Sequence, residues 1–439
     1  MDKPRILIIS SVTYGSGVLG VDIYDAFKQE GYNVDFLTKD PLAGYNEFLT
    51  VDSRKEYRYS PTHIAKALKW RIKKLLHPKG EKQALPGYCF FYKKESNPPI
   101  PVKKVTSLVK RHYDFVYVVF WQELLSYRTI RAIDKKLGGV PWLLATVDYS
   151  TMTGGCHFPI NCDRWQKECG CCPAWESWNP KDFTHHNILY RKRVIREMDI
   201  SLNTNSFQKD NFFSKSTLYK DARFLINYPL VNENEFRPLP VDKIRKELSL
   251  PIDKKIILFG SQDLQSEYKG MKYLFASFNV LYSQMSEDER KAIVVVSVGR
   301  SNEKVHQLIP FKYIDFGYVG IQQLAQLYAA ADIFACPSVF DPGPMMVNQA
   351  LSCGTPVVAF NQGAIQDINR FAECGYTARL RDVEDFSQGL NAILKMEKDN
   401  YERLRAICRE TALKMTSRHA IVERIMSFYD RELKYRVHK

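Results

Sequence analysis

Short runs of apolar residues alternate with amphipathic segments along this chain. Each run has the length of a buried strand, and the segments between them have apolar residues at helical spacing. The runs stand at 5–10 (RILIIS), 115–120 (FVYVVF), 141–147 (PWLLATV), 255–260 (KIILFG), 333–337 and 356–360. Strands buried on both faces and separated by helices indicate parallel sheets, so we predict an α/β protein with doubly wound sheets.

The N-terminal run opens a β-α-β unit with a glycine-rich turn. The loop after 5–10 holds Gly15, Ser16 and Gly17, and a helix ending at Gly31 and a strand at 33–38 follow. Such a turn serves either tight chain reversal or phosphate binding. In doubly wound sheets ligands bind at the carboxyl ends of the strands, where this loop and Asp148 both stand.

The stretch 331–360, ADIFACPSVFDPGPMMVNQALSCGTPVVAF, predicts a strand, a loop, a helix and a second strand. Its loop is rich in Pro and Gly, and the helical spacing from Met345 stops at Gly354. Asp341 therefore comes just before a helix N-terminus, where backbone N–H groups and the helix dipole favour an anion. Gln349 follows two turns later, near the same helix face.

A further loop follows the strand at 255–260. Gly260 permits close approach of the backbone, and Lys269 precedes a helix predicted from Met271. The Lys269 ammonium is placed to neutralise a diphosphate; the alternative is a solvated loop lysine. Arg300, after the strand IVVVSVG, is a candidate for a second positive charge.

Composition narrows the class of protein. The chain has 439 residues and a net charge of +14, and it shows no zinc-finger, helix-turn-helix or RNP pattern, which argues against nucleic-acid binding. A basic amphipathic segment at 66–82 is either an ordinary surface helix or a contact with an anionic membrane. We find no signal peptide and no spanning segment, and therefore expect a cytoplasmic protein, peripheral on the inner face of the membrane.

Five of the ten cysteines lie close together in MTGGCHFPINCDRWQKECGCCP. Four of them could supply thiolates to a structural Zn²⁺. The alternatives are free packed thiols and redox pairing. The four candidate ligands are Cys156, Cys162, Cys169 and Cys172.

The stretch 331–360 resembles the nucleotide-sugar glycosyltransferases of the GT-B fold, retaining family four. Their pattern is an acidic residue, seven residues, a Glu, then Ala-x-Ala-x-Gly-x-Pro-Val-Val. Asp341 matches the first acid and Gln349 stands at the Glu. The remaining matches are Ala350, Cys353, Gly354, Pro356, Val357 and Val358.

The cysteine-rich segment resembles the colanic-acid, exopolysaccharide branch of that family. The branch pattern is His-Asp-x-Trp-x-x-Thr-Gly-Gly-Cys-His, followed by spaced cysteines that end in Cys-Pro. Val147 stands at the family's first His and Ser150 at its Trp. The matching residues are Asp148, Thr153, Gly154, Gly155, Cys156, His157, Cys162, Cys169, Cys172 and Pro173.

The resemblance implies two Rossmann-like domains facing across a cleft. Residues 1–237 would form the acceptor-side domain, with a Cys-rich insertion at about 152–175. Residues 238–415 would bind the nucleotide sugar, and a helix in 416–439 would pack back on the first domain. The resemblance places Gly15, Ser16, Gly17 and Asp148 on the acceptor side of the cleft.

The activity implied is hexosyl transfer, with retention, from a UDP- or GDP-sugar to a glycan or lipid-linked acceptor hydroxyl in polysaccharide biosynthesis. Asp341 would stabilise or orient the reacting sugar, and no cofactor is required for catalysis. The alternative is a catalytically impaired scaffold that supports a partner transferase, since Val147 and Gln349 replace a His and a Glu and no Arg stands near Gln262. The donor would contact Gly260, Lys269, Arg300, Gly343, Pro344, Met345 and Gln349.

Overall fold

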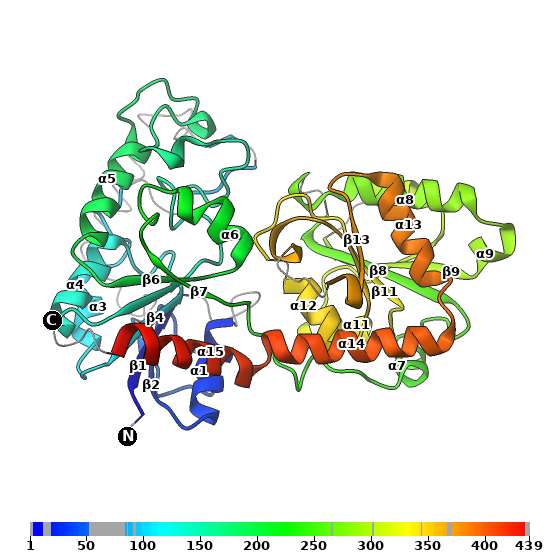
Figure 1. Cartoon of the computed structure of the whole chain (residues 1–439), viewed down its shortest axis with the longest axis horizontal. Coiled ribbons are helices and arrows are strands. Elements are labelled where there is room, and N and C mark those ends of the chain that lie inside the picture. Colours follow the sequence, from blue (N-terminus) through cyan, green and yellow to red (C-terminus); the bar gives the residue numbers. More distant parts are fainter. Residues whose placement is uncertain are drawn as a thin grey trace, which may run out of the picture. The chain divides into compact units, whose positions relative to one another are not determined.

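The computed structural model describes residues 3–11, 19–51, 84–85, 87–90, 94–264, 267–300, 303–343, 345–366 and 371–434. It divides into two compact units, and each is described by itself (Figure 1). Unit 1 comprises Met1–Thr204, Lys209–Ile226 and Val422–Lys439, and unit 2 comprises Asn205–Gln208 and Asn227–Ile421.

Within its described residues, unit 1 is built on a seven-stranded sheet in the order β3-β2-β1-β4-β5-β6-β7. All of its strand pairs are parallel. The strands are β1 (Arg5–Ser10), β2 (Asn33–Thr38), β3 (Leu49–Thr50), β4 (Phe115–Phe120), β5 (Trp142–Ala145), β6 (Ile200–Thr204) and β7 (Arg223–Ile226).

Helices connect these strands, as the alternating pattern predicts. Helix α3 packs on α4 and α4 packs on α5, while α1 packs on β1 and β2. Val422–Lys439 belongs to this unit, and the ring of Tyr429 stacks on Phe115 of β4 with centroids 5.0 Å apart. The helices are α1 (Leu19–Gln29), α3 (Val102–Leu108), α4 (Tyr127–Leu137), α5 (Phe183–Ile195) and α6 (Ser206–Asn211), whose first three residues belong to unit 2.

Unit 2 has a six-stranded sheet in its described part, in the order β10-β9-β8-β11-β12-β13. Its strand pairs are parallel as well. The strands are β8 (Lys255–Asp263), β9 (Ile293–Arg300), β10 (Lys312–Asp315), β11 (Ile333–Cys336), β12 (Val357–Phe360) and β13 (Gly375–Ala378).

Helices cover both faces of this second sheet. The described helices are α7 (Val241–Glu247), α8 (Met271–Gln284), α9 (Glu287–Lys291), α10 (Glu303–Leu308), α11 (Ile321–Ala330), α12 (Met345–Ser352), α13 (Val383–Leu394), α14 (Lys398–Thr416) and α15 (Arg418–Phe428), which passes into unit 1. Helices α8 and α13 lie side by side on one face, and α12 packs against α14 on the other (Figure 1).

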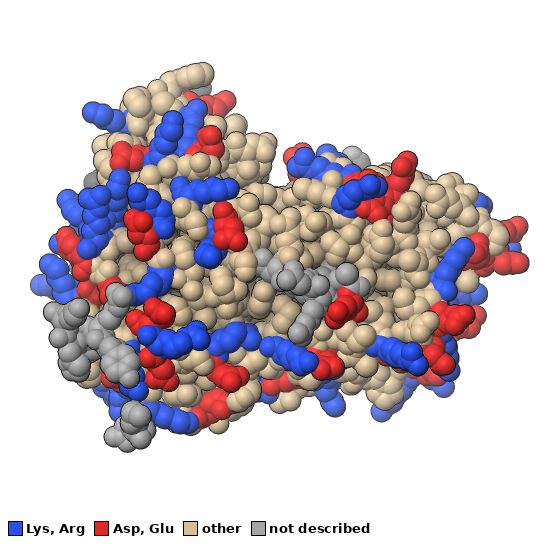
Figure 2. Space-filling view, in the orientation of Figure 1, with Lys and Arg blue, Asp and Glu red and all other residues tan. Residues whose placement is uncertain are grey.

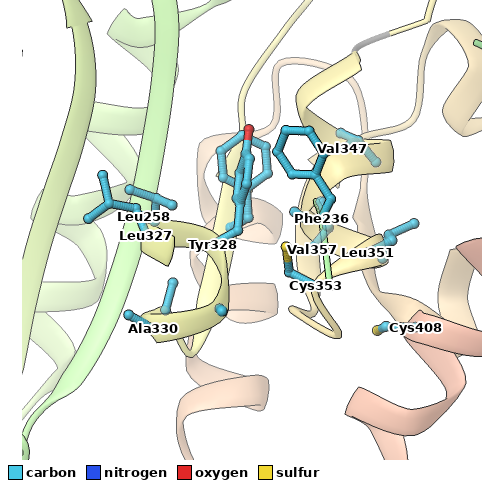
Figure 3. Close-up of a cluster of buried hydrophobic side chains, with 14 of the residues drawn as sticks. Phe236, Leu258, Leu327, Tyr328, Ala330, Val347, Leu351, Cys353, Val357 and Cys408 are labelled. Atoms are coloured by element: carbon cyan, nitrogen blue, oxygen red, sulfur yellow. The ribbon is translucent and has the colours of Figure 1, made fainter. Parts of the chain in front are cut away.

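Alternate residues of the unit 2 strands supply the cores on its two faces. Ile257 and Phe259 of β8 face the core of α8 and α13, and Ile256 and Leu258 face the core of α11, α12 and α14. In the second core Phe236 lies between Tyr328 of α11 and Val347 of α12 (Figure 3). The predicted α/β fold with two Rossmann-like, doubly wound domains is confirmed.

Two sequence expectations differ from the structure. The segment 199–206 (DISLNTNS) predicts a strand that runs to Ser206. The strand β6 ends at Thr204 instead, because the Asn205 side chain accepts a hydrogen bond from Gln208 N–H (2.8 Å) and α6 begins. Residues 227–237, assigned to the first domain from sequence, lie in unit 2, since Val231 and Phe236 are part of its core.

Asp134 on α4 is a buried acid of unit 1. Its Oδ1 accepts a hydrogen bond from Trp142 Nε1 at 2.8 Å. Burial raises the pKa of Asp134 from 3.8 to about 6, although the Trp142 hydrogen bond opposes the rise. A carboxyl whose pKa is higher in the folded state stabilises the fold while it is protonated, and that stability is lost as pH rises through the folded pKa.

We therefore expect Asp134→Asn to be more stable than the wild type at pH 8, by about 1–3 kcal/mol. The amide can still accept from Trp142 but carries no buried charge. The advantage should shrink toward zero at pH 4, measured by thermal unfolding at both pH values. Asp253→Asn is the control, because the Asp253 side chain is 76% exposed. Equal effects of the two substitutions at pH 8 would contradict the assignment.

Candidate functional site

The candidate donor site lies where the strand order of unit 2 reverses. From β8 the chain adds β9 and β10 on one side, then returns to place β11 on the other side of β8. The loops after β8 and β11 therefore leave the same edge of the sheet as neighbours. In doubly wound sheets this switch point is where ligands bind.

Main-chain contacts join these two loops. The N–H groups of Val339 and Phe340 donate to the Tyr268 carbonyl oxygen at 2.9 and 3.2 Å. Gly270, two residues after Tyr268, has a positive φ of 70°. A Cβ at this position would lie 2.0 Å from the Pro337 carbonyl oxygen. Only glycine fits this position, so the loops can meet main chain to main chain.

This contact brings Lys269 and Asp341 together. Lys269 Nζ lies 2.5 Å from Asp341 Oδ2, and their side chains are 29% and 9% exposed. Burial acts to lower the pKa of Lys269, but the Asp341 carboxylate outweighs burial and the pKa is raised above its ordinary value. The two residues predicted for phosphate binding and for catalysis thus form one partly buried ion pair.

Further contacts set the position of Asp341. Its N–H donates to Gln362 Oε1 at 3.0 Å, and its Oδ1 accepts from Gly343 N–H at 3.1 Å. The Asn205 side chain donates to the carbonyl oxygen of Pro342 at 2.7 Å. Asp341 is therefore held from both sides of its peptide and directed toward the lysine.

Gly260 of β8 and Arg300 of β9 lie near the same edge of the sheet. A Cβ on Gly260 would lie 2.3 Å from Val298 Cγ2 and 3.0 Å from Met346 Cε, so the glycine lets the end of β8 approach α12. Arg300, at the end of β9, pairs in register with Asp263 of β8 and is exposed. The structure thus places Arg300 at the same sheet edge as Gly260.

Helix α12 begins at Met345, and Gln349 follows within its second turn. Gln349 is half-buried, and its Oε1 lies 3.5 Å from the Tyr328 hydroxyl. The buried Tyr328 therefore stands behind the amide. Of the predicted site residues, Gly15, Ser16, Gly17 and Pro344 lie outside the described residues, as does the whole of the basic segment 66–82.

In unit 1, Asp148 follows β5 at the carboxyl edge and is buried, with 1% of its side chain exposed. His157 Nε2 lies 3.4 Å from its Oδ2, and its Oδ1 accepts from Ser150 N–H at 2.6 Å. Gln122 Nε2 donates to both Asp148 Oδ2 (3.3 Å) and Ser150 Oγ (3.0 Å). Burial raises the pKa of Asp148, while His157 and Ser150 oppose that rise.

A buried arginine holds the loop after Asp148. Arg191 of α5 pairs with Glu95, and its guanidinium donates to the carbonyl oxygens of Ser150 and Thr153. Glu95 also accepts from Tyr127 N–H at 3.0 Å. Sequence reasoning missed this pair, because Glu95 lies in an irregular stretch and Arg191 is one of several basic residues on α5. Neither position carries a periodic or spacing signal.

The four cysteines proposed as zinc ligands line one small cavity of unit 1, whereas Cys171 does not. Cys171 Sγ donates instead to the Trp178 carbonyl oxygen at 3.4 Å. Among the described residues, no three His, Cys, Asp or Glu side chains are already grouped so as to hold a metal ion. The cavity is lined by Cys156, Cys162, Cys169 and Cys172 together with Phe90, Trp165, Pro173 and neighbouring residues.

On the face shown in Figure 2, Lys and Arg side chains are interspersed with Asp and Glu side chains. Within the residues that the structure covers, no helix has the length and apolar content needed to cross a bilayer. The expected membrane contact through 66–82 therefore stays a prediction.

Comparison with known proteins places these features in context. Residues 253–396 match the family described as glycosyl transferases group 1. A D-inositol 3-phosphate glycosyltransferase of Thermobispora bispora is 25% identical over 196 residues, which cover 42% of this chain and 44% of that protein. The chain spans less than half the length of the curated relatives it matches.

Solved structures match over nearly the whole chain. Sucrose-phosphate synthase of Thermosynechococcus elongatus has a TM-score of 0.62 at 16% identity, covering 98% of this chain and 99% of that one. Anabaena HepE, solved in complex with UDP and glucose, has a TM-score of 0.59 at 12% identity, covering 97% and 99%. Residues 253–396 carry the sequence pattern of the group 1 glycosyltransferases, and the chain as a whole has the GT-B fold.

Proposed function

We propose that this protein is a glycosyltransferase that moves a hexosyl group from a nucleotide-sugar donor to a hydroxyl of a glycan or lipid-linked acceptor, in polysaccharide biosynthesis. The observation that carries the proposal is the Lys269–Asp341 ion pair. It stands at the switch point of the unit whose sequence matches the group 1 glycosyltransferases. An ammonium and a carboxylate side by side suit a substrate that separates charge as it reacts.

The reaction breaks the bond between the anomeric carbon and the diphosphate oxygen, and the electron pair leaves with the diphosphate. The Lys269 ammonium has three N–H donors, so it can bind a phosphate oxygen while it stays bonded to Asp341. The backbone at the start of α12 and its dipole add positive potential on the same side.

The sugar meanwhile gains positive charge at its anomeric carbon. The Asp341 carboxylate, fixed by Gly343 and Gln362, is the negative group that stabilises or orients it. The acceptor oxygen then bonds to that carbon. With retention, the acceptor arrives on the face from which the diphosphate leaves, so the leaving oxygen can take the acceptor's proton.

Two further assignments concern the nucleotide and the acceptor. The HepE structures hold UDP and UDP-glucose, which favours UDP over GDP as the nucleotide here. Gln349, on the first turns of α12, offers an amide oxygen and an NH₂ group to the ribose hydroxyls. On the acceptor side we assign His157 to contact the acceptor, with the buried Asp148 carboxylate holding its ring in place.

A nucleotide-binding measurement tests the donor assignment. With UDP or UDP-glucose at about a hundred times its dissociation constant, the wild type should gain ~2.7 kcal/mol, a shift of several degrees in thermal unfolding. Lys269→Ala should lose most of that shift. Lys272→Ala removes the same charge from an exposed site on α8 and should keep it. No shift with UDP, GDP, ADP, dTDP or their sugars in the wild type would favour the non-catalytic scaffold instead.

A turnover measurement tests Asp341. Release of UDP from UDP-glucose, by transfer or slow hydrolysis, should fall about a hundredfold or more in Asp341→Asn, because the amide keeps the Gly343 hydrogen bond but loses the charge. Asp253→Asn serves as the exposed control. Full turnover in Asp341→Asn, with a normal melting curve, would remove Asp341 from the reaction.

A third test concerns the loop that carries Asp341. Gly363 has a φ of 57°, and a Cβ there would lie 2.0 Å from the Asp341 carbonyl oxygen. We expect Gly363→Ala to shift Asp341 and to abolish the nucleotide-induced stabilisation. Gly317→Ala is the matched control, since its φ is 61° but no atom lies within 4 Å of its Cβ. Both variants place an alanine at a positive φ, which costs about 1–3 kcal/mol of stability. If the two variants bind nucleotide equally well, the loop does not position Asp341 as proposed.

A further inference from the structure

The cysteine-rich segment of unit 1 separates its five thiols into a group of four and a single one. The four line one cavity of about 20 Å³, which is room for a single small ion or water. Cys171 is adjacent in sequence but turns away to bond the Trp178 carbonyl oxygen. Packing of the thiols alone does not explain why four of them share one cavity and the fifth does not.

The backbone around the cavity bends sharply to direct the sulfurs inward. Cys169, Gly170 and Cys171 have consecutive positive φ values of 52°, 87° and 42°. Such a conformation is costly for residues other than glycine and persists where the surroundings hold it. A Cβ on Gly170 would lie 2.1 Å from the Pro180 carbonyl oxygen, so this turn is packed tightly against the chain.

A positively charged side chain lies beside the four thiols. Arg164 lines the same cavity, and its guanidinium donates to the Gly170 carbonyl oxygen at 3.3 Å. A positive charge here offsets the negative charge that four metal-bound thiolates would bring to the site.

We propose that Cys156, Cys162, Cys169 and Cys172 bind one structural Zn²⁺ ion in this cavity. Four soft thiolates in a closed site suit zinc in tetrahedral coordination, with Zn–S bonds of about 2.3 Å. The thiols are not drawn around one point in the structure, so binding requires them to rotate into the cavity that they already share. Loss of four thiol protons accompanies the four Zn–S bonds, and no oxidation occurs.

The ion would fasten a loop that also carries site residues. Cys156 bridges to Phe90 in an isolated strand pair, and His157 N–H donates to the Cys89 carbonyl oxygen at 2.9 Å. Tyr149 N–H in turn donates to the His157 carbonyl oxygen at 3.1 Å. The zinc would therefore hold the segment between Asp148 and His157 at the carboxyl edge of unit 1.

The test is metal analysis of the full chain, purified under reducing conditions without chelators. We expect one zinc per chain in the wild type and in Cys171→Ser, and less than a tenth of that in Cys156→Ser and Cys172→Ser. If these two variants fail to fold, the zinc content of the wild type still tests the proposal. A mercurial reagent should release one zinc as it titrates the four thiols, and Co²⁺ should replace zinc with the absorption bands of a tetrahedral thiolate site.

Three results would overturn the proposal. Wild-type protein without zinc, in which all ten thiols titrate after denaturation, would show free packed thiols. Fewer than ten titratable thiols without zinc would show disulfide pairing. Zinc retained in Cys172→Ser but lost in Cys171→Ser would likewise contradict the assignment. Nucleotide binding to unit 2 is measured separately, so none of these results bears on the proposed transferase activity.

Discussion

The main-chain contact between the loops that follow β8 and β11 is the constraint on which the donor-side site depends. It exists because β8 and β11 are neighbours at the point where the strand order reverses. Gly270 permits the approach, and Lys269 and Asp341 then face one another at 2.5 Å. Either charge alone, taken out of water, would cost several kcal/mol, so the pair is stable only together.

Unit 1 shows the same principle in a different form. The buried guanidinium of Arg191 is satisfied by Glu95 and by the carbonyl oxygens of Ser150 and Thr153. The network therefore fixes the path of the chain between Asp148 and Cys156, a stretch with no helix or strand of its own. Removing one member would leave a buried charge without its partner, which is why such networks hold irregular segments in one conformation.

Two of the replaced family residues have clear surroundings. Gln349 stands at the expected Glu, and its amide oxygen faces the hydroxyl of the buried Tyr328. A neutral amide can accept from this hydroxyl without placing a charge in a partly buried position. Val147 stands at the expected His, and the next residue, Asp148, has His157 Nε2 at 3.4 Å from its Oδ2. The imidazole beside this edge is that of His157, ten residues after the position that Val147 occupies.

Much of the fold was readable from the sequence by itself. The apolar runs at 5–10, 115–120, 333–337 and 356–360 predicted β1, β4, β11 and β12 within one or two residues, since a strand buried on both faces must be apolar throughout. The resemblance named Lys269, Asp341 and Gln349 because their spacing follows a pattern local to two loops and one helix. Local pattern was insufficient where a polar side chain redirected the backbone, as Asn205 does at the end of β6.

The sequence determined most of the elements, their arrangement in parallel sheets and the candidate residues, because hydrophobic periodicity and motif spacing are properties of neighbouring positions. Tertiary structure alone decided which loops meet. The Lys269–Asp341 pair joins residues 72 positions apart, and the Arg191–Glu95 pair joins residues 96 apart. Only the order of strands in a sheet sets such distances, and only packing shows which four of five adjacent cysteines share a cavity.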